Sequence, residues 1–233
     1  MCLPARQPTI ATILNITRIH ISVSAPGNWA RGLVISRTFS CVRRVGGKTL
    51  IDVPMHMRTL ASQHLEYRAM LYLAFFGVAL LGISEAASAP APVSQPADAT
   101  PAARFLALGP SAAVAAPLLL RLLASVSKAL IARAAISGLA ERMEPLGAVG
   151  YLENEDAAWN VARLFHDANV LSIWEGTTNV IAENVVRVLT GREVGEVQGA
   201  VEGWCGGGAR VGWGGGDEWR ARREIVERVW EGD

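Results

Sequence analysis

Cysteine and lysine are both scarce in this chain of 233 residues. The three cysteines, Cys2, Cys41 and Cys205, are scattered, and no two of them have the CxxC spacing of a metal site or a redox motif. This pattern argues against a disulfide scaffold and a zinc site, and it indicates a reducing compartment. Because Lys48 and Lys128 are the only lysines, arginine supplies 20 of the 22 basic side chains. Arginine suits phosphate and carboxylate binding, but a GC-rich genome produces the same bias.

An excess of charge of either sign is also lacking, since 22 basic and 21 acidic side chains leave a net charge of +1. This balance excludes a nucleic-acid-binding surface that extends over the whole chain. Residues 1–60 are uneven, however, because Asp52 is opposed there by Arg6, Arg18, Arg31, Arg37, Arg43, Arg44, Lys48 and Arg58. The first 40 residues have the composition of a mitochondrial transit peptide, so the localisation stays open between cytoplasm and mitochondrion.

Helical periodicity accounts for most of the chain. Hydrophobic residues make up 51% and charged residues 18%, which provides enough apolar surface for a sizeable core. Apolar residues recur at spacings of three and four, and the sequence contains no strand-hairpin signal, internal repeat or GxGxxG motif. The sequence therefore predicts an all-α fold, with helices over residues 14–43, 51–84, 117–144, 155–165, 178–189 and 217–230.

Two details of these helices can be tested against a structure. We expect Pro26-Gly27 to interrupt the first helix, because a proline inside a helix removes a backbone hydrogen bond. In the helix over 117–144, the expected apolar stripe consists of Leu119, Leu123, Val126, Leu130, Leu139 and Met143. The basic residues that lie between these positions are Arg121, Lys128, Arg133 and Arg142.

The uncharged run over residues 69–84 has 16 residues, whereas a membrane span needs roughly 20. We therefore expect a buried bundle helix and no membrane span; a membrane protein built on 69–84 and 105–120 is the alternative. Proline-rich residues 84–101 are expected to form a flexible linker, and glycine-rich residues 203–216 a disordered segment. The expected domains are a leader over 1–13, a helical bundle over 14–190, and a glycine-rich tail with a short terminal helix over 191–233.

Three short motifs lie at the ends of the predicted helices. Residues 43–48 read RRVGGK, residues 146–151 read LGAVGY, and residues 172–179 read SIWEGTTN. Each is ordinary when taken alone. A glycine pair before tyrosine is typical of a turn between helices, and Thr177 or Thr178 can cap the helix that follows.

Taken in order, the three motifs resemble the C-terminal helical domain of the acyl-CoA dehydrogenase family, whose marks are RxxFGK, GGxGY, an Arg-Asp-Ala segment and EGTxxIQ. The tryptophan at 174, before the glutamate, resembles the AidB-like branch. The resemblance covers residues 14–190 apart from the linker and implies an antiparallel four-helix bundle in an FAD-dependent oxidoreductase. Family members also have an N-terminal helical domain and a middle β-domain with no counterpart in this sequence, which suggests a truncated form with little activity of its own.

The resemblance implies a role for Glu175 as the base that removes the α-proton of an acyl-CoA thioester while FAD accepts hydride. Ile173 and Trp174 are expected to give this carboxyl an apolar environment, which would raise its pKa toward neutrality. Arg18 matches an arginine near the family's active site, and its helix carries no acid that could serve as the base instead. These two residues, Glu175 and Arg18, are the predicted catalytic residues.

The resemblance also implies a cofactor site and partners. The expected FAD-binding residues are Thr177 at a helix start, Arg43 across a dimer interface, and Gly147 and Gly150 in the glycine turn. Acyl-CoA is the expected substrate, the expected assembly is a homodimer or homotetramer, and no metal is expected. Departures from the family pattern occur at Val45, Gly46, Ala148, His166 and Ile181. The competing hypothesis is a non-catalytic AidB-like protein associated with DNA, or another interaction protein.

Overall fold

The computed structural model describes residues 9–88, 112–153 and 160–210, which are almost entirely helical, so the predicted all-α class is confirmed. The long helices are α1 (Thr9–Val42), α2 (Pro54–Ser88), α4 (Ala112–Met143), α6 (Val161–Leu171), α7 (Thr178–Thr190) and α8 (Val194–Arg210). The short elements are β1 (Arg44–Val45), β2 (Lys48–Thr49), the 3₁₀ helices η1 (Leu50–Asp52) and η4 (Glu144–Leu146), and α5 (Ala148–Tyr151). The chain divides into two compact units.

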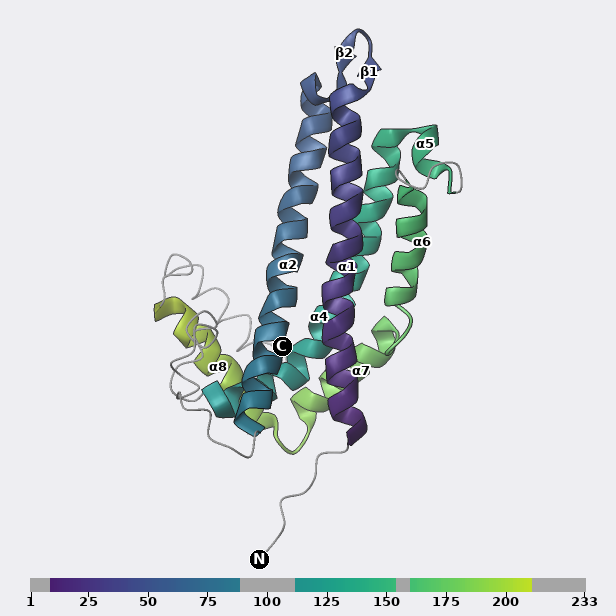
Figure 1. The fold of residues 1–233 in the computed structure, drawn as a ribbon. Coiled ribbons are helices and arrows are strands. Elements are labelled where there is room, and N and C mark those ends of the chain that lie inside the picture. The colour runs from purple at the N-terminus through teal and green to yellow at the C-terminus, as the bar shows by residue number, and fades with distance from the viewer. Residues whose placement is uncertain (1–8, 89–111, 154–159, 211–233) are drawn as a thin grey trace, which may run out of the picture. The chain divides into compact units, whose positions relative to one another are not determined.

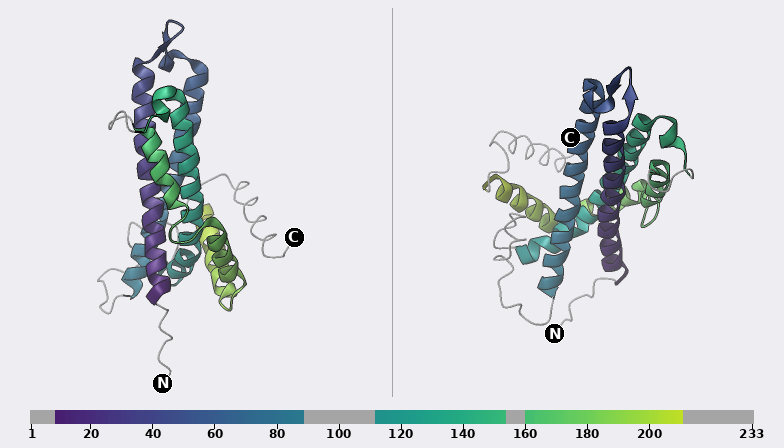
Figure 2. Two further views of the ribbon diagram at one scale, coloured as in Figure 1. Left: turned by 90° about the vertical axis from the view of Figure 1, so that its right-hand side faces the viewer. Right: turned by 45° about the horizontal axis from the view of Figure 1, so that its top comes forward.

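The first unit comprises residues 1–75 and 124–183 and contains an antiparallel four-helix bundle. Helix α1 runs up to the β1–β2 turn, α2 returns, α4 runs up again, and α6 returns (Figures 1 and 2). Each helix buries one face because its apolar stripe needs a partner. The main buried cluster consists of Ile21, Ala25, Trp29, Leu33, Ala74, Ile131, Ala132, Ala135 and Leu171.

Close contact between α1 and α4 depends on a glycine that sequence reasoning did not single out. A Cβ atom at Gly138 would lie 2.1 Å from the indole of Trp29. The Trp29 ring is fully buried, and its edge meets Tyr67 of α2 at 5.7 Å between ring centroids. An aromatic ring of this size dominates the local burial of apolar surface. Gly138 therefore makes room for the largest side chain in the core.

Helix α1 continues through Pro26, so the predicted interruption at Pro26-Gly27 is wrong. A proline inside a helix costs about 3 kcal/mol, but Ala25 and Trp29 on either side of it are fully buried in the main cluster. Because tertiary packing supplies most of the stability of a helix within a protein, the burial of this face outweighs the lost backbone hydrogen bond.

A small strand pair also corrects the sequence analysis, which expected no hairpin. Arg44 pairs with Thr49 and Val45 with Lys48 in antiparallel register. The two residues that connect the strands, Gly46 and Gly47, have φ angles of +57° and +82°. Two positive φ angles in a two-residue turn are what a tight hairpin requires, and glycine adopts them without strain.

The second unit comprises residues 76–123 and 184–233. In it, two helices extend further than the sequence predicted. Helix α2 extends to Ser88, so residues 84–88 are not part of a linker; residues 89–101 lie outside the described part of the chain. Helix α8 extends to Arg210, so residues 203–210 are helical rather than disordered. The ring of Trp204 packs on Phe76, with 5.1 Å between centroids, and fixes α8 to α2. The predicted helix over 217–230 and the rest of the tail are outside the described residues.

Helices α2 and α4 contain segments, Pro54–Ala86 and Val114–Leu146, that are long and apolar enough to cross a membrane by length and composition. Buried core helices of soluble proteins meet the same criterion. Both helices contribute fully buried residues to the helical packing, including Ala74, Leu80, Leu119 and Leu139. The absence of a membrane span remains a prediction.

Candidate active site

The turn between α6 and α7, residues 172–177, has an unusual backbone. The amide of Trp174 donates a hydrogen bond to the carbonyl of Val170 (3.1 Å) at the end of α6. The next two residues then have positive φ, +56° at Glu175 and +108° at Gly176. Within the described residues, Glu175 is the only non-glycine residue with positive φ. Such a conformation costs of order 1–3 kcal/mol and persists only where the surroundings impose it.

Two buried cations impose this conformation from two different helices. Arg18 of α1 donates from Nε to the carbonyl oxygen of Glu175 (3.3 Å) and from Nη1 to Oγ of Ser125 (3.0 Å). Lys128 of α4 donates from Nζ to the carbonyl oxygen of Gly176 (2.6 Å). Arg18 is 6% exposed and Lys128 is 1% exposed. Successive carbonyl groups of the turn are thus held by two charged donors, and hydrogen bonds of this kind are the stronger ones.

The carboxylate of Glu175 is held by one hydroxyl, because Thr17 Oγ1 donates to its Oε2 at 3.0 Å. The neighbouring side chains do not enclose it as the sequence analysis expected, since Ile173 is 60% exposed and Trp174 is 51% exposed. The apolar environment predicted for Glu175 is therefore not built from these two residues. The polar environment comes instead from α1 and α4.

Burial and charge both act on the two cations of this site. Burial lowers the pKa of Arg18, and the nearby Glu175 carboxylate opposes this shift. Burial and the charge of Arg18 lower the pKa of Lys128, again against the effect of Glu175. Two cations thus face one carboxylate in this part of the bundle, and desolvation disfavours the charged form of each cation.

The predicted residue Thr177 lies beside this cluster, at the start of α7, and is exposed. Its carbonyl accepts the first helical hydrogen bond of α7, from the amide of Ile181 (3.0 Å). Ile181 itself is buried and packs close to Gly176. The structure therefore brings Arg18, Glu175 and Thr177 together.

The other three predicted residues lie near the β1–β2 end of the bundle. At about 1.5 Å per residue, the 25 residues between Arg18 and Arg43 separate them by about 38 Å along α1. Gly147 has a φ of +63°, and a Cβ at Gly150 would lie 2.2 Å from the carbonyl oxygen of Met143. Both glycines are thus required by the local backbone. Arg43 is exposed at the end of α1.

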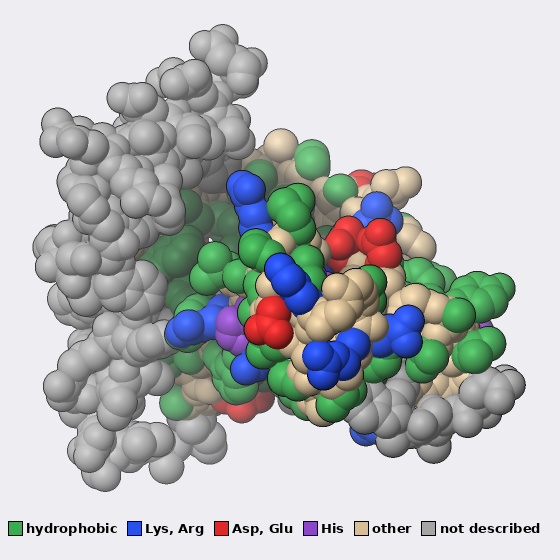
Figure 3. All heavy atoms as spheres, turned by 90° about the horizontal axis from the view of Figure 1, so that it is seen from above, with side chains coloured by type: hydrophobic (Ala, Val, Ile, Leu, Met, Phe, Trp, Pro, Cys, Tyr) green, Lys and Arg blue, Asp and Glu red, His purple; other side chains and the backbone are tan. Residues whose placement is uncertain are grey.

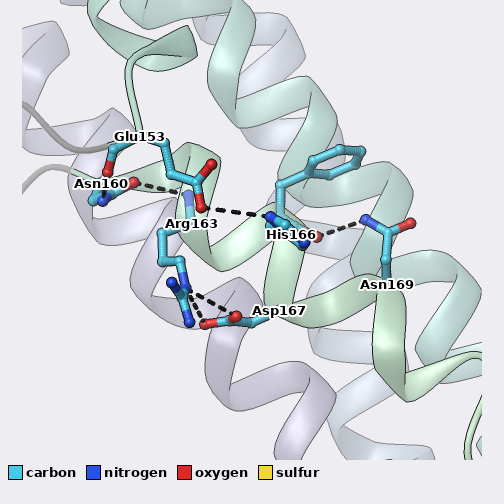
Figure 4. Close-up of polar contacts among 7 residues, drawn as sticks. Glu153, Asn160, Arg163, His166, Asp167 and Asn169 are labelled. Atoms are coloured by element: carbon cyan, nitrogen blue, oxygen red, sulfur yellow. Dashed lines mark hydrogen bonds and ion pairs between the residues drawn. The ribbon is translucent and has the colours of Figure 1, made fainter.

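The segment that matches the family's Arg-Asp-Ala lies on α6 (Figure 4). His166 points toward Glu153, with 3.4 Å between Nδ1 and Oε1, and both side chains are substantially exposed. Asp167 forms an ion pair with Arg163 one turn earlier, at 2.9 Å. The side chain of Asn160 caps the helix by accepting from the amide of Arg163 (2.8 Å). These contacts stabilise the start of α6, which begins later than the predicted helix over 155–165; residues 154–159 are outside the described part.

Sequence reasoning missed Lys128 and Arg142 because it placed the core face of α4 only partly correctly: Leu119 and Leu139 are buried as expected, but the two basic residues lie on the buried side with them. Leu130 was expected to face inward, but its side chain is exposed. The buried face instead follows Ala116, Leu119, Ala124, Lys128, Ile131, Ala135, Leu139 and Arg142. These positions have a helical period as well, but several are alanines, which contribute little to a hydrophobicity pattern. The two basic residues on this face were the available signal.

Arg142 is fully buried near the β1–β2 end of the bundle. None of its three guanidinium nitrogens has a hydrogen-bond partner among the described residues. Its backbone carbonyl accepts from Oγ of Ser36 (3.2 Å), and Ser40 Oγ lies 2.6 Å from Nε2 of His56. Burial and the charge of Arg142 lower the pKa of His56. Separately, no group of three or more His, Cys, Asp or Glu residues in the described segments is placed to hold a metal ion.

Comparisons with known proteins connect this geometry to a family. Residues 99–190 match the family model of the acyl-CoA dehydrogenase C-terminal domain. The chain is 35% identical over 184 residues to acyl-CoA dehydrogenase family member 11 of Caenorhabditis elegans, an alignment that covers 79% of the chain and 25% of that protein. It is 38% identical over 69 residues to the putative acyl-CoA dehydrogenase AidB of Escherichia coli, covering 30% of the chain and 12% of AidB.

Among solved structures, C. elegans ACDH-11 in complex with C11-CoA superposes with a TM-score of 0.68 and 29% identity. The superposition covers 94% of this chain and 32% of that one. The chain thus spans about a quarter to a third of the length of these C. elegans proteins. On the combined strength of motif order, fold and sequence identity, the chain belongs to the acyl-CoA dehydrogenase family and corresponds to its C-terminal helical domain.

Proposed function

We propose that this chain contributes the catalytic base to an FAD-dependent acyl-CoA dehydrogenase site, with Glu175 as the base. The observation that carries the proposal is the convergence of Thr17, Arg18 and Lys128 on Glu175 and its turn. A carboxylate held by its side chain and by its backbone is oriented for proton transfer. The C11-CoA complex of C. elegans ACDH-11 supports an acyl-CoA as the substrate class.

In the proposed reaction, the Cα–H bond of the thioester breaks and its proton moves to a carboxylate oxygen of Glu175. Bound FAD would supply the acceptor for the hydride that leaves Cβ, and the product would be the trans-2-enoyl thioester. Thr17 fixes one carboxylate oxygen through a 3.0 Å hydrogen bond. The backbone contact from Arg18 keeps the side chain of Glu175 at the same point relative to α1.

The residues beside Glu175 suit the pyrophosphate of FAD. Thr177 is exposed immediately before the first turn of α7, where the amide groups of a helix are not used by the helix itself. Such amides favour phosphate groups. Because Arg43 lies about 38 Å from Arg18 along α1, we propose that it reaches the cofactor of a second copy in a homodimer. Gly147 and Gly150 contribute to FAD binding in this proposal by allowing the backbone conformation of the turn that they form.

Departures from the family pattern predict weak FAD binding by the isolated chain. Gly46 stands where the family has phenylalanine, and Ala148 replaces the second glycine of the turn. Ile181 stands where the family has a glutamine that contacts adenine, and in this structure its side chain is buried. Each change removes or disturbs a contact to the cofactor.

The test is flavin reduction by an acyl-CoA, with FAD supplied in excess, in the wild-type chain and in Glu175→Gln. The glutamine keeps the size of the side chain but accepts no proton, so we expect reduction to slow by roughly 10²–10⁴-fold while FAD binding is unchanged. Glu144→Gln is the matched control, because Glu144 is exposed in η4. An unchanged rate in Glu175→Gln would refute the role of Glu175.

A second candidate function is DNA association, as proposed for an AidB-like protein without catalysis. Figure 3 looks down on the β1–β2 end and shows Lys and Arg side chains distributed over this face, among apolar and a few acidic ones. The exposed basic residues near this end are Arg37, Arg43, Arg44, Lys48 and Arg58. If this face binds DNA, affinity for a short duplex should fall steeply with salt, and Arg43→Ala/Arg44→Ala should reduce that dependence. Binding without a salt dependence would exclude it.

A further inference from the structure

The peptide group between Gly176 and Thr177 joins the two halves of the proposed site. Its carbonyl oxygen belongs to Gly176 and accepts the hydrogen bond from Lys128 (2.6 Å). Its N–H belongs to Thr177, at the beginning of α7. Because a peptide group is planar, a donor that fixes the direction of the oxygen also fixes the direction of the N–H.

Glycine gives this peptide little resistance to rotation on its own. Gly176 has a φ of +108°, in a region that only glycine occupies readily and from which it leaves just as readily. The preceding residue, Glu175, is itself in the left-handed region. An external contact is therefore needed to select one orientation, and the ammonium group of Lys128 provides it from the buried face of α4.

Arg18 does not duplicate this contact. Its Nε binds the preceding carbonyl, that of Glu175, and its Nη1 is engaged by Ser125. The two cations thus hold two successive peptide groups, one on the side of the carboxylate and one on the side of α7. A lysine with an apolar stem and a single charged tip fits the second task, because its stem packs in the bundle while its tip donates.

We propose that Lys128 is a positioning residue that fixes the Gly176–Thr177 peptide, and thereby sets the Glu175 carboxylate and the amide of Thr177, immediately before α7, relative to each other. The inference rests on the proposed function for its catalytic meaning, but its structural part is independent. Loss of Lys128 releases the peptide without removing any group that touches the substrate. The expected result is a slower chemical step with little change in substrate affinity.

The sequence offers a selective probe, since Gly176–Thr177 is the only Gly-Thr pair in the chain. Labelling glycine carbonyls with ¹³C and threonine amides with ¹⁵N yields one carbonyl–nitrogen correlation in the NMR spectrum. In the full chain, Lys128→Met should shift the Gly176 carbonyl resonance upfield, because a charge-assisted hydrogen bond is lost. Lys128→Arg should retain most of the wild-type shift. The matched control is Arg133→Met, an exposed cation on the same helix, which should leave the resonance unchanged.

A carbonyl resonance that stays in place in Lys128→Met would overturn the proposal. If Lys128→Met does not fold, Lys128→Gln serves as the test. Its neutral amide donates a weaker hydrogen bond, so the Gly176 carbonyl resonance should move part of the way upfield. A resonance that does not move would overturn the proposal. In flavin reduction, Lys128→Met should lower kcat by about tenfold or more with KM nearly unchanged. A raised KM at unchanged kcat would overturn the positioning role. Flavin reduction in Glu175→Gln at the wild-type rate would reject the proposed function while the NMR result still stands.

Discussion

Lys128 and Arg142 are two buried cations on one face of α4, and they differ in whether their charged groups have hydrogen-bond partners. Lys128 donates to the carbonyl of Gly176 and faces the Glu175 carboxylate. Arg142, four turns further along, is 0% exposed and has no partner for its guanidinium nitrogens within the described residues. Burial lowers the pKa of both. The comparison shows that burial of a charge does not by itself mark a functional site; the groups that converge on it do.

The largest expected effect comes from removing the unpaired cation. Arg142→Met keeps the apolar stem and deletes the charge, so it should raise the free energy of unfolding by about 1–4 kcal/mol in urea denaturation. Arg133→Met, at an exposed position of the same helix, should change it by less than about 0.5 kcal/mol. The pKa of His56 should rise in Arg142→Met, because the charge of Arg142 lowers it in the wild type. A destabilised Arg142→Met would mean that the guanidinium is satisfied.

The next effect concerns Lys128 and pH. The folded chain binds the Lys128 proton less tightly than the unfolded chain does, because burial and Arg18 lower its pKa. The free energy of unfolding of the wild type, relative to Lys128→Met, should therefore rise as pH increases from the lowered pKa toward 10.5, the ordinary value for lysine. Urea denaturation of both chains across this range measures the difference. A difference that falls with pH would contradict the burial of a charged lysine.

The smallest effect is expected on the surface of α6. His166→Ala removes the exposed contact with Glu153 at 3.4 Å. Exposed pairs of this kind contribute little, so the free energy of unfolding should change by less than about 0.5 kcal/mol at neutral pH. Thermal unfolding followed by circular dichroism is sufficient to test this. A loss of several kcal/mol would place His166 in a role that its exposure does not suggest.

The sequence predicted most of the helices because the spacing of their apolar residues is a local signal. The turn that contains Glu175 was singled out in another way, through the resemblance of three motifs, taken in order, to one family. Features that depend on distant contacts were predicted wrongly. Helix α8 persists past Gly203 because Trp204 meets Phe76, and α1 persists through Pro26 because its neighbours are buried. In the candidate site, Arg18, Glu175 and Thr177 were predicted through the family resemblance, whereas the place of Lys128 depends on how α4 packs.

The unequal exposure of the two lysines has a practical consequence for labelling. Lys128 is buried in the bundle, whereas Lys48 is exposed in β2 at the tip of the hairpin. An amine-reactive fluorophore applied to the folded chain should therefore modify a single side chain, together with the α-amino group. The hairpin thus offers a natural attachment point for a reporter dye or a surface tether, beyond the end of α1 that lies away from Arg18.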